Sequence, residues 1–263
     1  MNFDAIVVAG GRGSRLGGRD KPLLLHRGTT LLDHALRATA GARRIAVVGP
    51  TELNPAVSRY AAEADAGQVI TLTREYPAFA GPAAAVAAGA RSLGDRIAGE
   101  VPVDRSHAPL TLILAADLVE PAPIAAGILR YTFDHCAEAP AATTPGTTPG
   151  TAPRATGQAP RTAPDAERDG LALEEFGTAW VPVDVTGRLQ PLSCVIETPA
   201  LLRAIDAAEK PGEGLANSSM MRLLAKVHIV RVGLDGVDYA DVDTWEDADK
   251  AGIVRPPVDG RGT

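Results

Sequence analysis

The chain opens with an apolar stretch that runs directly into glycines and basic side chains. The residues Ala5 to Ala9 are apolar and partly β-branched, and Gly10-Gly11 and four basic residues follow them: Arg12, Arg15, Arg19 and Lys21. Glycine lets backbone N–H groups approach anionic oxygen closely, and the basic side chains neutralise its charge. This stretch therefore predicts a buried strand that leads into a polyphosphate-binding loop.

Two familiar phosphate-binding motifs do not fit this loop. A dinucleotide fingerprint that starts at Gly11 requires glycine at position 16, where this chain has Leu16. A P-loop requires Gly-Lys followed by serine or threonine, whereas Gly18 is followed by Arg19, Asp20, Lys21 and Pro22. An ordinary glycine-rich turn with solvated arginines is the alternative, and the joint spacing of Gly, Arg and Lys disfavours it.

An aspartate stands where a metal ion could meet the polyphosphate. Asp117 directly follows the apolar run from Leu110 to Ala116, and open parallel sheets bind ligands beyond the carboxyl ends of their strands. A carboxylate that faces a polyphosphate needs a cation between them, and Mg²⁺ requires few protein ligands. We therefore predict that Asp117 binds Mg²⁺. The alternative is that Asp117 caps a helix beginning near Pro121.

A second acidic segment lies near the end of the chain, in Asp241-Val-Asp243-Thr244-Trp-Glu246. Asp243 and Glu246 have the spacing of a capping box for a final helix. Their carboxylates could also bind the metal or the substrate. The sequence leaves both interpretations open, and the two can coexist.

Composition limits the class of protein. The chain has 263 residues, 45% of them hydrophobic, and a net charge of −6. This size suits one α/β domain with a substantial core, and the charge gives no global basic field for nucleic acid. Cys136 and Cys194 lack the spacing of a zinc site or a disulfide framework. We find no pattern of a signal peptide or membrane span and expect a cytoplasmic protein that binds neither nucleic acid nor membranes.

Hydrophobic periodicity predicts a doubly wound, mostly parallel α/β sheet, because strand-like and helix-like segments alternate. Strands are expected at 5–9, 45–48, 69–72, 110–116, 178–183, 192–196 and 227–232, and helices at 30–38, 52–64, 83–90, 200–208, 219–224 and 244–251. The Thr/Pro/Ala-rich stretch at about 138–168 has almost no residue that could anchor a core, and we expect a disordered insertion there. The rest of 1–252 then forms a single domain, and 253–263 a flexible tail.

The opening loop also resembles a known family. The pattern Ala9-Gly-Gly-x-x-x-Arg15-x-Gly17, with Lys21 four residues later and Pro-Leu-Leu after it, is similar to the signature of sugar-phosphate and cofactor nucleotidyltransferases. It is most similar to the molybdenum cofactor guanylyltransferase (MobA-like) branch. The resemblance implies a Rossmann-like nucleotidyltransferase fold of the nucleotide-diphospho-sugar transferase type. It also implies Mg²⁺-dependent transfer of GMP from GTP to Mo-molybdopterin, with release of pyrophosphate.

The resemblance assigns roles to individual residues. The expected catalytic residues are Arg15, Lys21 and Asp117, and the expected metal ligands are Asp117 and Asp243. The expected nucleotide-binding residues are Val8, Ala9, Gly10, Gly11, Arg12, Gly13, Lys21, Gly49, Glu75, Gly81 and Pro82. The expected acceptor-binding residues are Arg188, Gln190 and Asp241, of which Arg188 could pair with the phosphate of the acceptor or remain a solvated hairpin arginine.

Base choice and acceptor identity are left open by the sequence. Glu75 could accept hydrogen bonds from guanine N1–H and its 2-amino group, but a surface salt bridge between Arg74 and Glu75 explains the pair equally well. Relatives of the guanylyltransferase type often have Asn-x-Asn where this chain has Asp241 and Asp243. CTP transfer to molybdopterin, GTP transfer to a small phosphorylated acid and a non-catalytic nucleotide-binding regulator are therefore alternatives. If the protein transfers GMP to Mo-molybdopterin, it could also contact molybdoenzymes or other cofactor-pathway proteins.

Overall fold

The computed structural model describes residues 2–11, 14–18, 20–65, 67–94, 108–136, 176–209 and 214–254. Arg12, Gly13 and Arg19 of the opening loop lie outside the described residues, as do the expected insertion at 138–168 and residues 255–263 of the expected tail. Ile253 is buried in a small cluster that contains Leu16 and Leu31. The packed part of the chain therefore includes Ile253.

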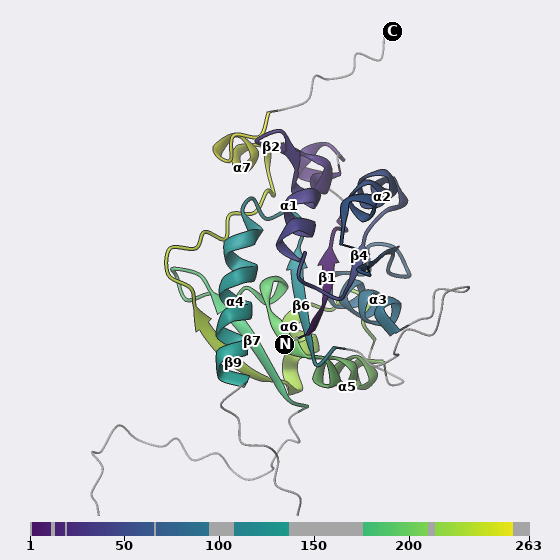
Figure 1. Ribbon diagram of the computed structural model, residues 1–263, viewed down its shortest axis with the longest axis vertical. Coiled ribbons are helices and arrows are strands. Elements are labelled where there is room, and N and C mark those ends of the chain that lie inside the picture. Colours follow the sequence, from purple (N-terminus) through teal and green to yellow (C-terminus); the bar gives the residue numbers. More distant parts are fainter. Residues whose placement is uncertain are drawn as a thin grey trace, which may run out of the picture.

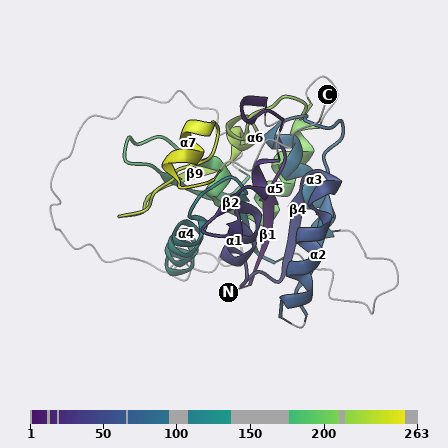
Figure 2. The same ribbon diagram turned by 90° about the horizontal axis from the view of Figure 1, so that it is seen from above.

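A seven-stranded sheet forms the centre of the molecule, with helices on both of its faces (Figures 1 and 2). Its order is β5-β4-β1-β6-β8-β7-β9, and only β8 runs antiparallel to its neighbours. The predicted mostly parallel, doubly wound α/β fold is confirmed. The strands are β1 (Phe3–Val8), β4 (Arg44–Val48), β5 (Val69–Thr73), β6 (Leu110–Ala115), β7 (Thr178–Val183), β8 (Val195–Glu197) and β9 (His228–Gly233).

The strands are apolar along their length because helices bury both faces of the sheet. Ile6 of β1 lies in the core that includes helices α3, α5 and α6, whereas its neighbours Ala5 and Val7 lie in the core that includes α1, α2 and α4. The helices are α1 (Leu31–Ala38), α2 (Asn54–Glu63), α3 (Pro82–Gly94), α4 (Pro121–Cys136), α5 (Thr198–Ala208), α6 (Met220–Leu223) and α7 (Trp245–Lys250). None of the helices in the described ranges has the length and apolar character needed to cross a membrane.

The small residues of α3 have a packing reason. A Cβ atom on Gly89 would lie 2.6 Å from Cγ2 of Ile6 and 3.0 Å from Cγ2 of Val48, a separation that real Cβ atoms do not tolerate. The helix therefore lies close against β1 and β4, and the run of alanines and glycine at 83–90 permits this approach.

Two local features differ from the expectation. The strand expected at 192–196 is wrong at its start, because Pro191–Ser193 forms a 3₁₀ turn and β8 begins only at Val195. A two-stranded hairpin, β2 (Leu25–His26) and β3 (Thr29–Thr30), was not anticipated. Arg27 and Gly28 form its turn with φ of 50° and 78°, the positive values that a two-residue hairpin loop requires.

Parallel pairing brings distant loops to one edge of the sheet. Strand β1 pairs with β6 so that Val8 lies opposite Ala115, and the loops after both strands therefore emerge side by side. A segment before α7 closes over this edge: Asp241 forms a β-bridge with Leu118, and the N–H of Val242 donates to the carbonyl of Asp117 at 3.1 Å. In Figure 1, β1 points from the marked N-terminus toward the end of the molecule where β2 and α7 lie.

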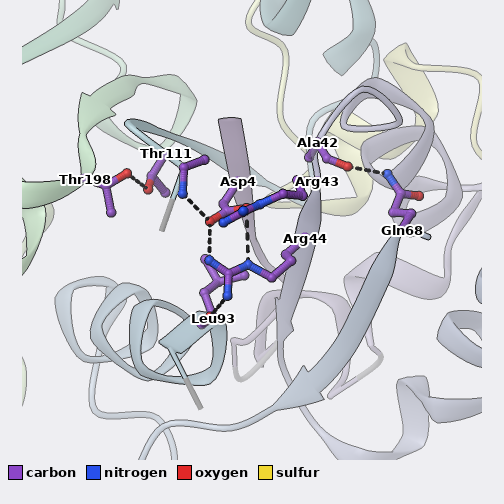
Figure 3. A network of polar contacts seen from close by, with 9 residues as sticks. Asp4, Ala42, Arg43, Arg44, Gln68, Leu93, Thr111 and Thr198 are labelled. Carbon is purple, nitrogen blue, oxygen red and sulfur yellow. Dashed lines mark hydrogen bonds and ion pairs between the residues drawn. The ribbon is translucent and has the colours of Figure 1, made fainter. Parts of the chain in front are cut away.

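The opposite end of β1 holds a buried ion-pair network, shown in Figure 3. Asp4 is fully buried, and its Oδ2 accepts hydrogen bonds from Arg44 at 2.8 Å and from the backbone N–H of Ala108 at 3.1 Å. Its Oδ1 lies 3.6 Å from Nε of Arg43. Arg44 also donates to the carbonyl of Leu93 at the end of α3. A single carboxylate thus joins β1, β4, α3 and the start of β6.

We expect Asp4→Ala to lower the free energy of unfolding by about 3–5 kcal/mol, because it leaves a largely buried arginine without its partner. Urea unfolding followed by circular dichroism measures the change. Glu209→Ala is the control, since Glu209 pairs with Arg91 at the surface and exposed pairs contribute at most about 1 kcal/mol. Equal, small losses in both variants would show that the Asp4 network does not stabilise the sheet.

Candidate functional site

Lys21 lies between two carboxylates that come from distant parts of the chain. Its Nζ donates to Oδ1 of Asp243 and lies 3.6 Å from Oδ2 of Asp117. Asp117 follows β6, Asp243 precedes α7, and Lys21 begins a 3₁₀ turn after the glycine loop. Arg15 is more exposed, and its Nη1 lies 3.8 Å from Oδ2 of Asp243. The structure therefore brings all three expected catalytic residues to one place.

The capping box of α7 is not the one expected from sequence. Thr244 is the N-cap: its Oγ1 accepts from the N–H of Asp247 at 3.2 Å, and Oδ2 of Asp247 accepts from the N–H of Thr244 at 2.8 Å. The expected capping box of Asp243 and Glu246 is therefore wrong. Because Asp243 lies one residue before the cap, its carboxylate faces Lys21 instead.

Three carboxylates form a compact acidic cluster at this edge. Oxygen atoms of Asp117, Asp241 and Asp243 lie within 4.8 Å of one another. Burial raises the pKa of Asp117 above its usual range; nearby Lys21 lowers this pKa, and Asp241 raises it again. Burial and the neighbouring Asp243 likewise raise the pKa of Asp241. Several hard oxygen donors around one point fit a divalent cation such as Mg²⁺.

Asp117 is poorly placed to cap the next helix. Helix α4 begins at Pro121, four residues further along the chain, so that Glu120 occupies the position before the first helical residue. Asp241, which we expected to contact the acceptor, lies in the acidic cluster with Asp117 and Asp243 and also lines a cavity with Arg188 and Gln190.

The expected nucleotide side contains a buried carboxylate. The side chain of Glu75 is only 7% exposed, and its Oε1 accepts from the backbone N–H of Phe79 at 2.8 Å. Its Oε2 is buried without a hydrogen-bond partner. Both oxygens lie 3.8–3.9 Å from the position that a Cβ on Gly10 would occupy. Glu75 therefore lies beside the glycine loop.

The alternative of a surface salt bridge between Arg74 and Glu75 is wrong. Glu75 is buried, and no ion pair joins it to Arg74 in the part of the chain that the structure describes. The guanidinium of Arg74 instead lies over the ring of Phe79, 5.2 Å from its centroid.

Gly49 is required by close approach of the loops after β1 and β4. A Cβ atom at Gly49 would lie 2.7 Å from Cδ1 of Leu53 and 3.0 Å from the carbonyl oxygen of Ala9. The N–H of Ala9 in turn donates to the carbonyl of Val48 at 2.8 Å. The chain therefore leaves β1 directly beside Gly49.

The other expected nucleotide residues lie at the start of α3. Pro82 is its first residue, and Gly81 has a φ of 94°, which favours glycine. A Cβ at Gly81 would meet Ser218 and Asn217 of the segment before α6, and the N–H of Ala83 donates to the carbonyl of Ser218 at 3.3 Å. This segment thus packs against the loop that carries Glu75. Ser219 caps α6, as its position before that helix suggested.

The expected acceptor residues border a separate cavity of about 380 Å³. Arg188 and Gln190 lie on one wall, in the turn after β7, and the segment from Val237 to Asp241 forms the other. The side chain of Arg188 is exposed, with no ion-pair or hydrogen-bond partner among the described residues. Since Asp241 also belongs to the acidic cluster, the cavity adjoins that cluster.

Two further residues line this cavity, Asp184 and Tyr239, and sequence reasoning missed the second of them. Asp184 accepts hydrogen bonds from three residues of its own turn, and the spacing of Asp184, Thr186 and Gly187 is a sequence signal for such a turn. The hydroxyl of Tyr239 is buried without a hydrogen-bond partner. Burial and the charge of Asp184 raise the pKa of Tyr239. No local sequence pattern marks Tyr239.

Residues 5–229 match the family model described as MobA-like NTP transferase domain. The chain belongs to this family. A molybdenum cofactor guanylyltransferase from Bordetella petrii is 35% identical over 119 residues, which cover 44% of this chain and 57% of that protein. One from Acidiphilium cryptum is 54% identical over 37 residues, covering 14% and 19%. The matched part of the chain thus spans a little more than half the length of the first relative and about a fifth of the second.

Solved structures show the same fold in other MobA-like and related proteins. The molybdopterin-guanine dinucleotide biosynthesis protein A of Archaeoglobus fulgidus superposes with a TM-score of 0.53 at 14% identity, covering 95% of this chain and 96% of that chain. The inositol-1-phosphate CTP transferase of T. maritima gives 0.55 at 11% identity, covering 95% and 94%. At such low identity the likeness concerns the fold alone.

We expect Asp117→Asn to stabilise the protein when divalent cations are absent. Because the folded state raises the pKa of Asp117, its contribution to stability is lost as pH rises from about 3.9 through the raised value. Removing the charge should therefore raise the melting temperature at pH 7.5 by about 2–4 °C, the shift that about 1 kcal/mol gives a domain of this size.

Differential scanning calorimetry between pH 4 and pH 8 tests this, and the gain should shrink toward pH 4. The same variant should bind Mn²⁺ more weakly in electron paramagnetic resonance titrations, since it loses one oxygen anion of the cluster. A lower melting temperature at pH 7.5 would show that Asp117 is stabilised, not strained, by its surroundings.

Proposed function

We propose that this protein transfers GMP from GTP to a phosphorylated acceptor, Mo-molybdopterin, and releases pyrophosphate. The observation that carries the proposal is the meeting of Lys21 with Asp117 and Asp243 beside the glycine loop, in a chain of the MobA-like family. The curated relatives named molybdenum cofactor guanylyltransferase support the choice of base and acceptor.

In this reaction an oxygen of the acceptor phosphate attacks the α-phosphorus of GTP. The bond from the α-phosphorus to the oxygen that bridges it to the β-phosphate breaks, and that oxygen leaves with pyrophosphate. Such a transfer needs little covalent participation by the protein; it needs alignment of the two phosphates and neutralisation of negative charge. Lys21, Arg15 and the acidic cluster carry charges that suit both the alignment of the phosphates and the neutralisation of their charge.

Each residue of the centre has a distinct role in the proposal. Lys21 is largely buried and held by its carboxylate neighbours, so its charge is in place before the triphosphate arrives. Arg15 is exposed and can follow the β- and γ-phosphates. Asp117 and Asp243, joined by Asp241, would hold Mg²⁺. When bound, Mg²⁺ would offset charge on the α-phosphate and the attacking oxygen.

Guanine specificity is assigned to Glu75. Its Oε2 is a buried acceptor without a partner, and an unpaired buried acceptor is unfavourable until a donor satisfies it. Guanine offers N1–H and a 2-amino group as donors, whereas cytosine and adenine lack the N1–H. The backbone of Gly10, which carries no side chain beside Glu75, would line the same subsite, and Gly49 would contribute through backbone atoms alone.

On composition and on the burial of Ile253, we further propose that residues 1–253 form a single catalytic domain interrupted by an insertion at about 138–168. The insertion lies outside the described residues. The helix before it, α4, and the strand after it, β7, both contribute to the core on the α1 side of the sheet.

Lys21→Ala and Asp117→Ala should each lower the rate of pyrophosphate release from GTP with molybdopterin by at least about 10²-fold, because each removes a preorganised charge at the transferring phosphate. Lys226→Ala is the control, since Lys226 lies over the ring of Phe176 at the surface and should leave turnover unchanged. Turnover like that of the wild type in Lys21→Ala or Asp117→Ala would refute the mechanism.

Base choice is tested by the same assay with each of the four NTPs. The wild type should prefer GTP, and Glu75→Gln should lower kcat/KM for GTP by about 10–100-fold, because one acceptor oxygen is replaced by an amide N–H. ITP, which lacks the 2-amino group, should be affected less than GTP. Preference for CTP, or release of pyrophosphate only with another acceptor, would overturn the guanylyl or the molybdopterin assignment.

A further inference from the structure

The acceptor cavity is organised by one carboxylate in the turn after β7. Oδ1 of Asp184 accepts from the N–H and the hydroxyl of Thr186 at 2.9 and 2.6 Å, and from the N–H of Arg188 at 3.0 Å. The backbone closes the same turn, because the N–H of Asp184 donates to the carbonyl of Arg188 at 3.0 Å. The position of Arg188 is therefore set by Asp184.

The remaining oxygen of Asp184 fixes the neighbouring amide. Oδ2 accepts from Nε2 of Gln190 at 3.0 Å, while the N–H of Gln190 donates to the carbonyl of Pro182 at 2.8 Å. An ionised carboxylate can only accept hydrogen bonds, so Gln190 must turn its NH₂ group toward Asp184. No group of the described residues donates to Oε1 of Gln190, which is left as an acceptor for another molecule.

Asp184 keeps its charge at neutral pH. Hydrogen bonds from the hydroxyl of Thr186 and from the backbone N–H groups of Arg188 and Thr186 hold the pKa of Asp184 below its usual range. The orientation of the Gln190 amide is therefore maintained over the physiological pH range. Both Arg188 and Gln190 line the cavity that reaches Asp241.

We propose that Asp184 is a positioning residue that sets the hydrogen-bonding polarity of the acceptor cavity. It holds Gln190 so that the carbonyl oxygen is the group offered to the acceptor, beside the exposed guanidinium of Arg188. The cavity thereby selects a phosphorylated molecule that carries an N–H or O–H donor as well as its anionic group. This proposal rests on the proposed function in taking the cavity as the acceptor site.

The test exchanges donor and acceptor between the two side chains. Asp184→Asn keeps an oxygen for the turn but places an NH₂ group against Gln190, so the glutamine amide must reverse and offer NH₂ to the acceptor. KM for molybdopterin should then rise about tenfold or more, with kcat changed much less, because a donor faces a donor. Gln190→Glu alone should also raise KM, since two carboxylates would face each other.

In the double variant Asp184→Asn/Gln190→Glu, the new amide NH₂ at position 184 donates to the new carboxylate at position 190. The second carboxylate oxygen at position 190 then faces the acceptor substrate, as the amide oxygen does in the wild type. The KM of the double variant should return to within about threefold of the wild-type value. Asp235→Asn is the matched control, because it removes one negative charge from a neighbouring exposed turn, outside the residues that line the cavity. The proposal is overturned if Asp184→Asn behaves like Asp235→Asn, or if the double variant is no better than Asp184→Asn.

Urea unfolding of the wild type, Asp184→Asn, Gln190→Glu and the double variant separates this proposal from the proposed function. The double-mutant cycle measures the coupling between residues 184 and 190 without any substrate. Coupling in the unfolding cycle, with no transfer to molybdopterin by the wild type, would reject the molybdopterin assignment and leave the positioning contact standing. Absence of coupling in that cycle would reject the positioning role, whatever the wild type transfers.

Discussion

The structure depends on holding three like charges together at one edge of the sheet. Asp117 comes from the middle of the chain, and Asp241 and Asp243 come from its last segment. Their oxygens meet only because the β-bridge between Leu118 and Asp241 pins that segment over the end of β6. Carboxylates this close repel one another in a partly buried setting. Lys21 offsets part of the repulsion, and a bound divalent cation would offset more of it.

The two ends of β1 show how differently a fold can treat buried charge. At the amino end, Asp4 meets Arg43 and Arg44 and a backbone N–H, so one negative charge faces two positive ones. At the carboxyl end, three carboxylates share Lys21 and the more distant Arg15. The first arrangement is complete without a ligand and stabilises the sheet. The second has an excess of negative charge, and such local incompleteness is typical of a functional site.

The core of the fold could be read from sequence because its signals are local. The apolar run that ends at Ala9 and the apolar run before Asp117 each predict a buried strand. Parallel pairing of these strands then places the loops that follow them side by side. The capping register could not be read in this way. Asp243 with Glu246 and Thr244 with Asp247 both have the spacing of a capping box. In the folded chain Asp243 pairs with Lys21, 222 residues away, and Thr244 takes the capping position.

Burial was the second quantity that the sequence did not reveal. Arg74 and Glu75 look like a surface pair, but the loop after β5 turns Glu75 toward Gly10, and the N–H of Phe79 holds it there. The late start of β8 has a simpler cause: Leu192 continues an apolar run, yet Pro191 before it favours a turn over a ladder. Both cases required knowledge of where neighbouring segments lie.

The side chains of Glu75 and Gln190 are held in the same way, Glu75 beside the glycine loop and Gln190 in the cavity that reaches Asp241. Each side chain has one polar end bound by the protein itself, to the N–H of Phe79 or to the carboxylate of Asp184. The other end has no hydrogen-bond partner among the described residues. A polar group held in this way selects a ligand by the donor that the ligand must bring, and it does so without touching the reacting phosphates. In the proposed function, a change at either residue alters the preference for base or acceptor while Lys21 and the acidic cluster stay as they are.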